Sequence, residues 1–168
     1  MRRTIATVVV LLLAGALVSC GGDKKESSSR APEPTSGAAT PTGEITPADR
    51  PACALLFARL QRVTAALQTS SDLIAHSLNK RQLSRRIAVQ QMQLERSARL
   101  MTGGPIPAPL AAADRQLVNA LRAFSRDFAR AKVQAAHGNF QAAAAAMSDP
   151  PVVEKILSAS KTIEDACK

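Results

Sequence analysis

The stretch LAAADRQLVNALRAFSRDFARAKVQAAHG, residues 110–138, decides the fold class. Its larger apolar residues recur at steps of three, four or seven, which places them on one face of an α-helix. That stripe comprises Leu110, Leu117, Leu121, Phe124, Phe128, Ala131 and Ala135. Gly138 follows directly, and glycine is the usual residue just past a helix C-terminus. The sequence therefore predicts one long amphipathic helix that ends at Gly138.

Two similar stripes precede this segment. The first predicts a helix that begins at the N-cap candidate Asp49 and ends near Asn79; it comprises Cys53, Leu56, Leu60, Val63, Leu67, Ser70 and Ile74. The second predicts a helix that Gly103-Gly104-Pro105 ends; it comprises Leu83, Ile87, Leu94, Ala98 and Met101.

The segment after Gly138 predicts a fourth helix in two pieces. A short alanine-rich piece runs from Asn139 to Met147, and Asp149-Pro150-Pro151 interrupts it, with Asp149 as the cap and proline in the first turn. The last stripe is Val153, Ile156, Ser160, Ile163 and Cys167.

No segment alternates with period two, so we expect an all-α domain over residues 49–168. Short connections between long helices favour antiparallel neighbours, which predicts an up-down-up-down four-helix bundle. Small or polar residues interrupt the stripes and predict a core that is thin in places: Ser70, Gln90, Ala131 and Ser160.

The N-terminus has the parts of a secretory signal. Met1-Arg2-Arg3 is basic, and the apolar run from Ile5 to Val18 is shorter than the ~20 residues of a transmembrane helix. Leu17-Val18-Ser19-Cys20 resembles the lipobox of bacterial lipoproteins. The resemblance implies cleavage of residues 1–19, a diacylglycerol on Cys20 and a position on the outer face of the cell membrane. An ordinary signal cut near Ser19 is the alternative.

The next stretch, residues 20–48, is rich in Gly, Ser, Thr and Pro and has one large apolar residue, Ile45. Such a composition does not bury enough apolar surface to offset its ordering entropy, so we expect a disordered tether. Its expected role is to space the helical domain from the membrane.

With Cys20 assigned to lipid, Cys53 and Cys167 remain in an oxidising compartment, where an even number suggests a disulfide. The bundle topology predicts the same bond, because it brings the start of the first helix and the end of the last to one end. Two separate buried thiols are the alternative.

The sequence offers little catalytic chemistry. His76 and His137 have no partners at metal-ligand spacing, and Glu164-Asp165 point apart on a helix. No nucleophile elbow or phosphate loop is present in the sequence. We therefore expect a non-enzymatic protein without metal or cofactor.

Charge supplies the most specific hypothesis. The formal net charge of +9 falls to +7 when Arg2 and Arg3 leave with the signal. Basic residues concentrate on the second and third helices, where a shared surface is predicted from Arg81, Arg85, Arg86, Arg115, Arg122, Arg126 and Arg130. An exported protein does not meet a chromosome, so the expected partners are anionic lipid, an envelope polymer or an acidic protein, not nucleic acid. A merely solvated face is the alternative.

The chain as a whole resembles the small lipoproteins and secreted helical proteins common in actinobacteria. Besides the lipobox, the resemblance rests on Pro51–Cys53, Gly138–Ala142, Ser148–Val153 and Cys167. The resemblance implies a class of protein but no mechanism. Two functions are therefore expected: an accessory or interaction module of the cell envelope, or a small carrier that holds a lipid or other apolar ligand in the bundle.

Overall fold

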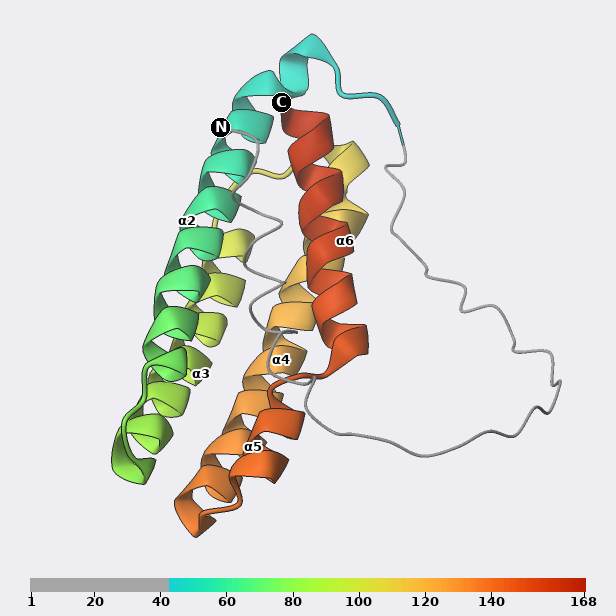
Figure 1. Ribbon diagram of the computed structural model, residues 1–168. Coiled ribbons are helices and arrows are strands. Elements are labelled where there is room, and N and C mark those ends of the chain that lie inside the picture. The colour runs from blue at the N-terminus through green and yellow to red at the C-terminus, as the bar shows by residue number, and fades with distance from the viewer. Residues whose placement is uncertain (1–42) are drawn as a thin grey trace, which may run out of the picture. The chain divides into compact units, whose positions relative to one another are not determined.

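The computed structural model describes residues 43–168, so the predicted signal, Cys20 and most of the tether lie outside the described residues. Four long helices follow one another as an up-down-up-down bundle (Figure 1). They are α2 (Arg50–Ala75), α3 (Lys80–Thr102), α4 (Ala111–His137) and α6 (Pro150–Cys167). Within residues 43–168 there is no strand. The predicted all-α bundle is confirmed.

The boundary between α2 and α3 differs from the prediction by a few residues. We expected the first helix to end near Asn79, but α2 ends at Ala75 and Asn79 directly precedes the next helix. The side-chain oxygen of Asn79 accepts a hydrogen bond of 2.9 Å from the backbone N–H of Gln82. Because an asparagine at this position satisfies a free N–H of the first helical turn, it acts as an N-cap of α3.

The start of α2 is also more elaborate than expected. Asp49 precedes the helix as predicted, but its carboxylate accepts bonds from the Thr46 N–H at 3.0 Å and the Thr46 hydroxyl at 2.6 Å. Asp49 thus closes the 3-10 turn η2 (Pro47–Asp49) and does not bond to the first turn of α2. These hydrogen bonds lower the pKa of Asp49. Ile45 packs against the core, so the packed domain begins slightly before residue 49.

The core follows the predicted stripes. Its fully buried leucines include Leu56, Leu94, Leu117 and Leu121, and α3 and α4 share the most extensive contact of any helix pair. Ser70, Gln90 and Ala131 interrupt the apolar residues and are buried as well. The Gln90 side-chain oxygen has no hydrogen-bond partner within the described residues. The core is therefore continuous and contains an unsatisfied amide near mid-bundle.

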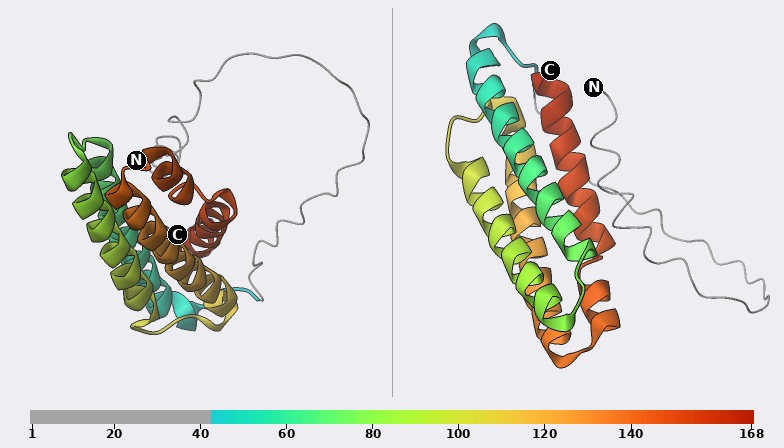
Figure 2. Two further views of the ribbon diagram at one scale, coloured as in Figure 1. Left: turned by 90° about the horizontal axis from the view of Figure 1, so that it is seen from below. Right: turned by 60° about the vertical axis from the view of Figure 1, so that its left-hand side comes forward.

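The last helix is in two pieces, as predicted. Gly138 adopts a left-handed conformation (φ 85°) that ends α4, and the short helix α5 (Phe140–Ala146) follows. The chain then breaks at Asp149 before Pro150 begins α6, although the Asp149 side chain makes no capping bond. Figure 2 shows α6 running back beside α4 toward the start of α2.

Cys53 and Cys167 are joined by a disulfide, with their Cα atoms 5.2 Å apart. The bond links the first turns of α2 to the last residue of α6, which is the pairing that the topology predicted. We call this the disulfide end of the bundle; it also holds the connection between α3 and α4. The opposite end, which we call the free end, consists of the turns at residues 76–79 and 138–140.

Candidate interaction surfaces

The outer face of α3 and α4 carries a set of exposed arginines. Five of the seven predicted basic residues lie there: Arg81, Arg85, Arg115, Arg122 and Arg126. On α4 the last three are spaced by seven and four residues, which puts them on one face of that helix. Arg96 and Arg99 extend the same exposed face of α3. None of the seven guanidinium groups makes a hydrogen bond or an ion pair within residues 43–168.

Arg86 and Arg130, the other two predicted members, are engaged elsewhere. Arg86 points toward α2, where its guanidinium donates to the carbonyl oxygen of Leu73. Arg130 donates to the Asp127 carboxylate at 2.5 Å. Compared with the prediction, the basic surface therefore loses Arg86 and Arg130 and gains Arg96 and Arg99.

One carboxylate, that of Glu95, lies among these arginines on α3, and it accepts a hydrogen bond of 3.2 Å from the Ser125 hydroxyl on α4. Glu95, together with the buried Asp114 and Asp127 near Arg115 and Arg126, offsets only part of the seven positive charges. The potential over this face is therefore positive, and ionic strength screens it over about 10 Å. Such a surface attracts anions broadly and carries no reacting group.

The surface deepens toward the free end. A hollow of about 430 Å³ lies between the start of α3 and the end of α4, lined by Lys80, Arg81, Ser84, Arg85 and Ala136. Gly138 lies beside this hollow: a Cβ atom added to Gly138 would be 3.6 Å from the Lys80 ammonium nitrogen. The α2–α3 turn therefore lies beside the α4–α5 turn.

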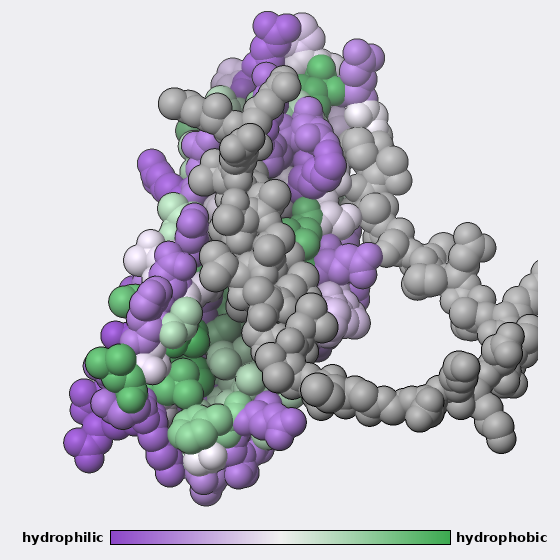
Figure 3. Space-filling view, viewed as in Figure 1, coloured by the Kyte–Doolittle hydropathy of each residue, from purple (hydrophilic) through white to green (hydrophobic). Residues whose placement is uncertain are grey.

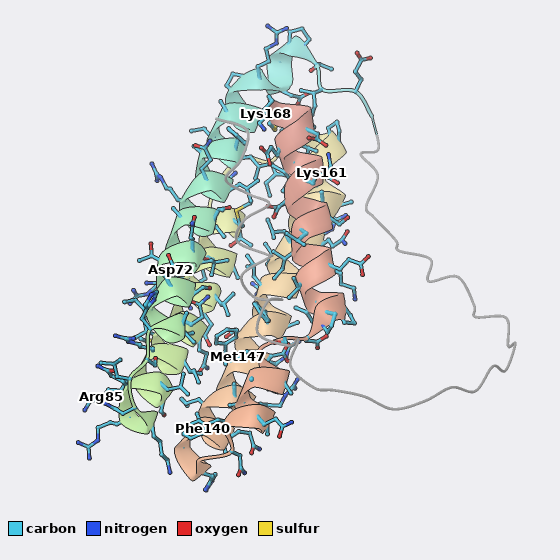
Figure 4. The ribbon with its side chains drawn as sticks, viewed as in Figure 1. Asp72, Arg85, Phe140, Met147, Lys161 and Lys168 are labelled. Atoms are coloured by element: carbon cyan, nitrogen blue, oxygen red, sulfur yellow. A yellow bond between two sulfur atoms is a disulfide. The ribbon has the colours of Figure 1, made fainter. Side chains whose placement is uncertain are left out.

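The same end exposes apolar side chains. Leu78 is 87% exposed in the α2–α3 turn, Phe140 is 48% exposed at the start of α5, and Leu73 is 45% exposed. Figure 4 shows Arg85 and Phe140 at this end, and Figure 3 shows hydrophobic residues gathered over the lower part of one face. These apolar side chains lie at the end of the bundle that also carries Lys80, Arg81 and Arg85.

The disulfide end, by contrast, contains a buried arginine that sequence reasoning missed. Arg59 donates to the carbonyl oxygens of Met101 at 2.9 Å and Pro105 at 2.7 Å, and so ties α2 to the end of α3 and its following loop. Asp114 is buried nearby. Burial raises the pKa of Asp114, and the positive charges of Arg59 and Arg115 offset part of that rise. A hollow of about 140 Å³ beside Arg59 is small and open.

Asp127 is a second buried carboxylate, on the side of α4 that faces the α5–α6 break. Burial raises its pKa most, the charge of Asp149 adds to the rise, and Arg130 and Arg126 oppose it. One of its oxygens pairs with Arg130 and the other has no partner within the described residues.

The sequence contains a signal for these buried charged groups. Arg59, Asp114 and Asp127 each lie three or four residues from core members, which puts a charge on the apolar stripe. A charge in that position indicates either a buried polar contact or the edge of the stripe, and the sequence does not separate the two.

The remaining chemistry of the described part is sparse. His76 ends α2, where its Nδ1 lies 2.7 Å from the Asp72 carbonyl oxygen, and His137 ends α4. Residues 43–168 contain no group of three or more His, Cys, Asp or Glu side chains arranged to hold a metal ion. Among the helices of this region, none is long and apolar enough to cross a bilayer.

Comparisons of the chain with protein-family models, curated proteins and solved structures find no match.

Proposed function

We propose that this protein is an exported, lipid-anchored, non-enzymatic interaction module of the bacterial cell envelope. The observation that carries the proposal is the outer face of α3 and α4, where seven exposed guanidinium groups make no hydrogen bond or ion pair within residues 43–168. Cations without internal partners do not stabilise the fold, so their concentration on one face favours an anionic partner. The lipobox resemblance at Leu17–Cys20 supports the anchor.

The alternative function, a carrier with an apolar ligand inside the bundle, has less support. Its expected mark is an apolar cavity of ~300 Å³ or more. The larger of the two best-formed hollows in residues 43–168 is lined mainly by charged side chains and lies at the surface. The buried apolar residues of the described part form one hydrophobic cluster.

Two measurements test the proposal. The intact mass of the chain purified from an exporting bacterium should show loss of residues 1–19 and gain of a diacylglyceryl group; Cys20→Ser should remove that gain. A chain that is cut without lipid, or left uncut, would contradict the anchor.

For the basic face, the probe is a short inorganic polyphosphate. The triple variant Arg115→Gln, Arg122→Gln, Arg126→Gln should lose affinity by more than tenfold. The control removes the same charge at Lys155 and Lys161 of α6 and at Lys168 directly after it, and should lose much less. Equal losses of affinity would show that binding follows the net charge of the protein and does not depend on this face.

A further inference from the structure

We infer that the free end of the bundle docks on the anionic lipid surface of the membrane that carries the anchor. This deepens the proposed function, on which it rests, by naming the partner and the part of the domain that touches it. The observation is a juxtaposition of two kinds of side chain at one end: exposed apolar groups and unpaired cations.

The apolar part consists of two turn residues. Leu78 is 87% exposed in the turn between α2 and α3, and Phe140 is 48% exposed just after Gly138. Because the Lys80 ammonium lies beside Gly138, these turns belong to the same end of the bundle. Neither residue contributes to the core.

The cationic part lies next to them. Lys80, Arg81 and Arg85 line the hollow at the start of α3, and none has an ion-pair partner within the described residues. Each Lys or Arg close to an anionic bilayer strengthens binding by about fivefold. Apolar side chains beside basic ones are the pattern of proteins that lie in the headgroup region.

This pairing selects lipid among the anionic partners. A soluble polyanion would satisfy the cations, but it has no apolar phase for Leu78 and Phe140. A bilayer surface offers both phosphate groups and, a few ångströms deeper, hydrocarbon. An acidic protein with an apolar patch would also offer both, and the test below separates it from lipid.

The anchor permits this orientation. Gly43 lies at the disulfide end, where a Cβ atom on it would be 3.6 Å from the Pro109 ring. The bundle is about 40 Å long, the length of the 27-residue helix α4. The 22 residues between Cys20 and Gly43 can span up to about 75 Å. The free end can therefore reach the membrane to which Cys20 is attached.

The absence of tryptophan and tyrosine from the sequence provides the test. In Leu78→Trp the new residue is the sole indole fluorophore, and the position is so exposed that the fold should tolerate it. The whole lipidated chain is placed in vesicles of phosphatidylcholine alone, or of phosphatidylcholine and phosphatidylglycerol in equal parts, each with and without brominated lipid. Leu55→Trp, an equally conservative change at an exposed leucine toward the disulfide end, is the control.

We expect blue-shifted, bromolipid-quenched emission from Leu78→Trp in anionic vesicles only, and unchanged emission from Leu55→Trp. Adding Lys80→Gln, Arg81→Gln and Arg85→Gln should lower the docking equilibrium constant by about a hundredfold. No quenching in anionic vesicles, or equal quenching in neutral ones, would overturn the inference. A blue shift without quenching would also overturn it, by showing that Leu78 is covered by protein.

Failure of the anchor is distinguishable from failure of docking. If the intact mass shows no lipid, the same Leu78→Trp chain is mixed with added vesicles. Quenching by anionic vesicles then supports docking although the proposed anchor is wrong, whereas its absence overturns docking as well.

Discussion

At the disulfide end of the bundle, the Cys53–Cys167 bond joins α2 to α6, Arg59 joins α2 to the end of α3, and Asp49 closes the turn before α2. At the free end, by contrast, two short turns leave Leu78 and Phe140 exposed to water. Both ends carry positive charge. At the disulfide end, however, Arg59 is bonded to carbonyl oxygens, while Lys80, Arg81 and Arg85 have no ion-pair partner within the described residues. Hydrogen bonds hold the free end as well, from Arg86 to the Leu73 carbonyl and at the Asn79 cap. The exposed apolar and cationic side chains are the reason why we propose the free end as the one that binds.

The largest expected effect comes from the disulfide. Cys53→Ser with Cys167→Ser should lower the free energy of unfolding by up to about 4.7 kcal/mol, because the bond closes a loop with a sequence separation of 114 residues. Denaturant titration of both proteins measures the difference. A loss below about 1 kcal/mol would mean that the fastening of this end lies elsewhere.

The buried arginine should have the next largest effect. Arg59→Met removes the bonds to Met101 and Pro105 and leaves the buried Asp114 with Arg115 alone as a nearby cation, so we expect a loss of about 3 kcal/mol. Arg62→Met, an exposed neighbour on the same helix, should change stability by no more than about 0.5 kcal/mol. Similar losses of stability in the two variants would show that Arg59 has no special role in holding the disulfide end together.

A smaller, pH-dependent effect is expected at Asp127, between the two ends. Its folded-state pKa is raised by burial, so the folded protein binds its proton more tightly than the unfolded chain. That contribution to stability is present below about pH 4 and is lost as the pH rises through the folded-state pKa. Asp127→Asn should therefore gain up to about 1 kcal/mol relative to the natural chain at neutral pH.

Urea titrations at several pH values check this prediction. The advantage of Asp127→Asn should shrink toward acidic pH, where the natural aspartate is protonated. An advantage that grows on acidification would mean that the pairing of Asp127 with Arg130 outweighs the burial of its other oxygen.

The smallest effect on stability is expected at the free end. Leu78→Ser and Phe140→Ser should each change the free energy of unfolding by no more than about 0.5 kcal/mol, because neither side chain belongs to the core. Thermal unfolding followed by circular dichroism suffices. A loss of several kcal/mol would mean that these side chains stabilise the fold, so that the two ends do not differ in the way described.

Much of the fold could be predicted from the sequence because its signals are local. The stripe from Leu110 to Ala135 and the stops at Gly103 and Gly138 fix three helices, and the two cysteines tested their arrangement. The error near Asn79 has a local cause, since asparagine suits both a helix end and a helix start.

The candidate surfaces were harder to predict because they depend on distant contacts. Arg86 and Arg85 are neighbours in the sequence, yet one reaches the carbonyl of Leu73 and the other lines the hollow beside Ala136. The partners of Arg59 lie 42 and 46 residues away. The exposure of Leu78 follows from the way its turn projects, which no apolar stripe encodes.

The difference between the two ends is tested most directly by chemical modification of arginines in the whole chain, with the proposed lipid on Cys20, on anionic vesicles. Mass spectrometry follows the modification residue by residue. Exposed Arg81 and Arg85 at the free end should react several times more slowly than on neutral vesicles, while exposed Arg50 and Arg62 on α2 should react equally on both. Protection of Arg50 and Arg62 with full reactivity of Arg81 and Arg85 would contradict the account.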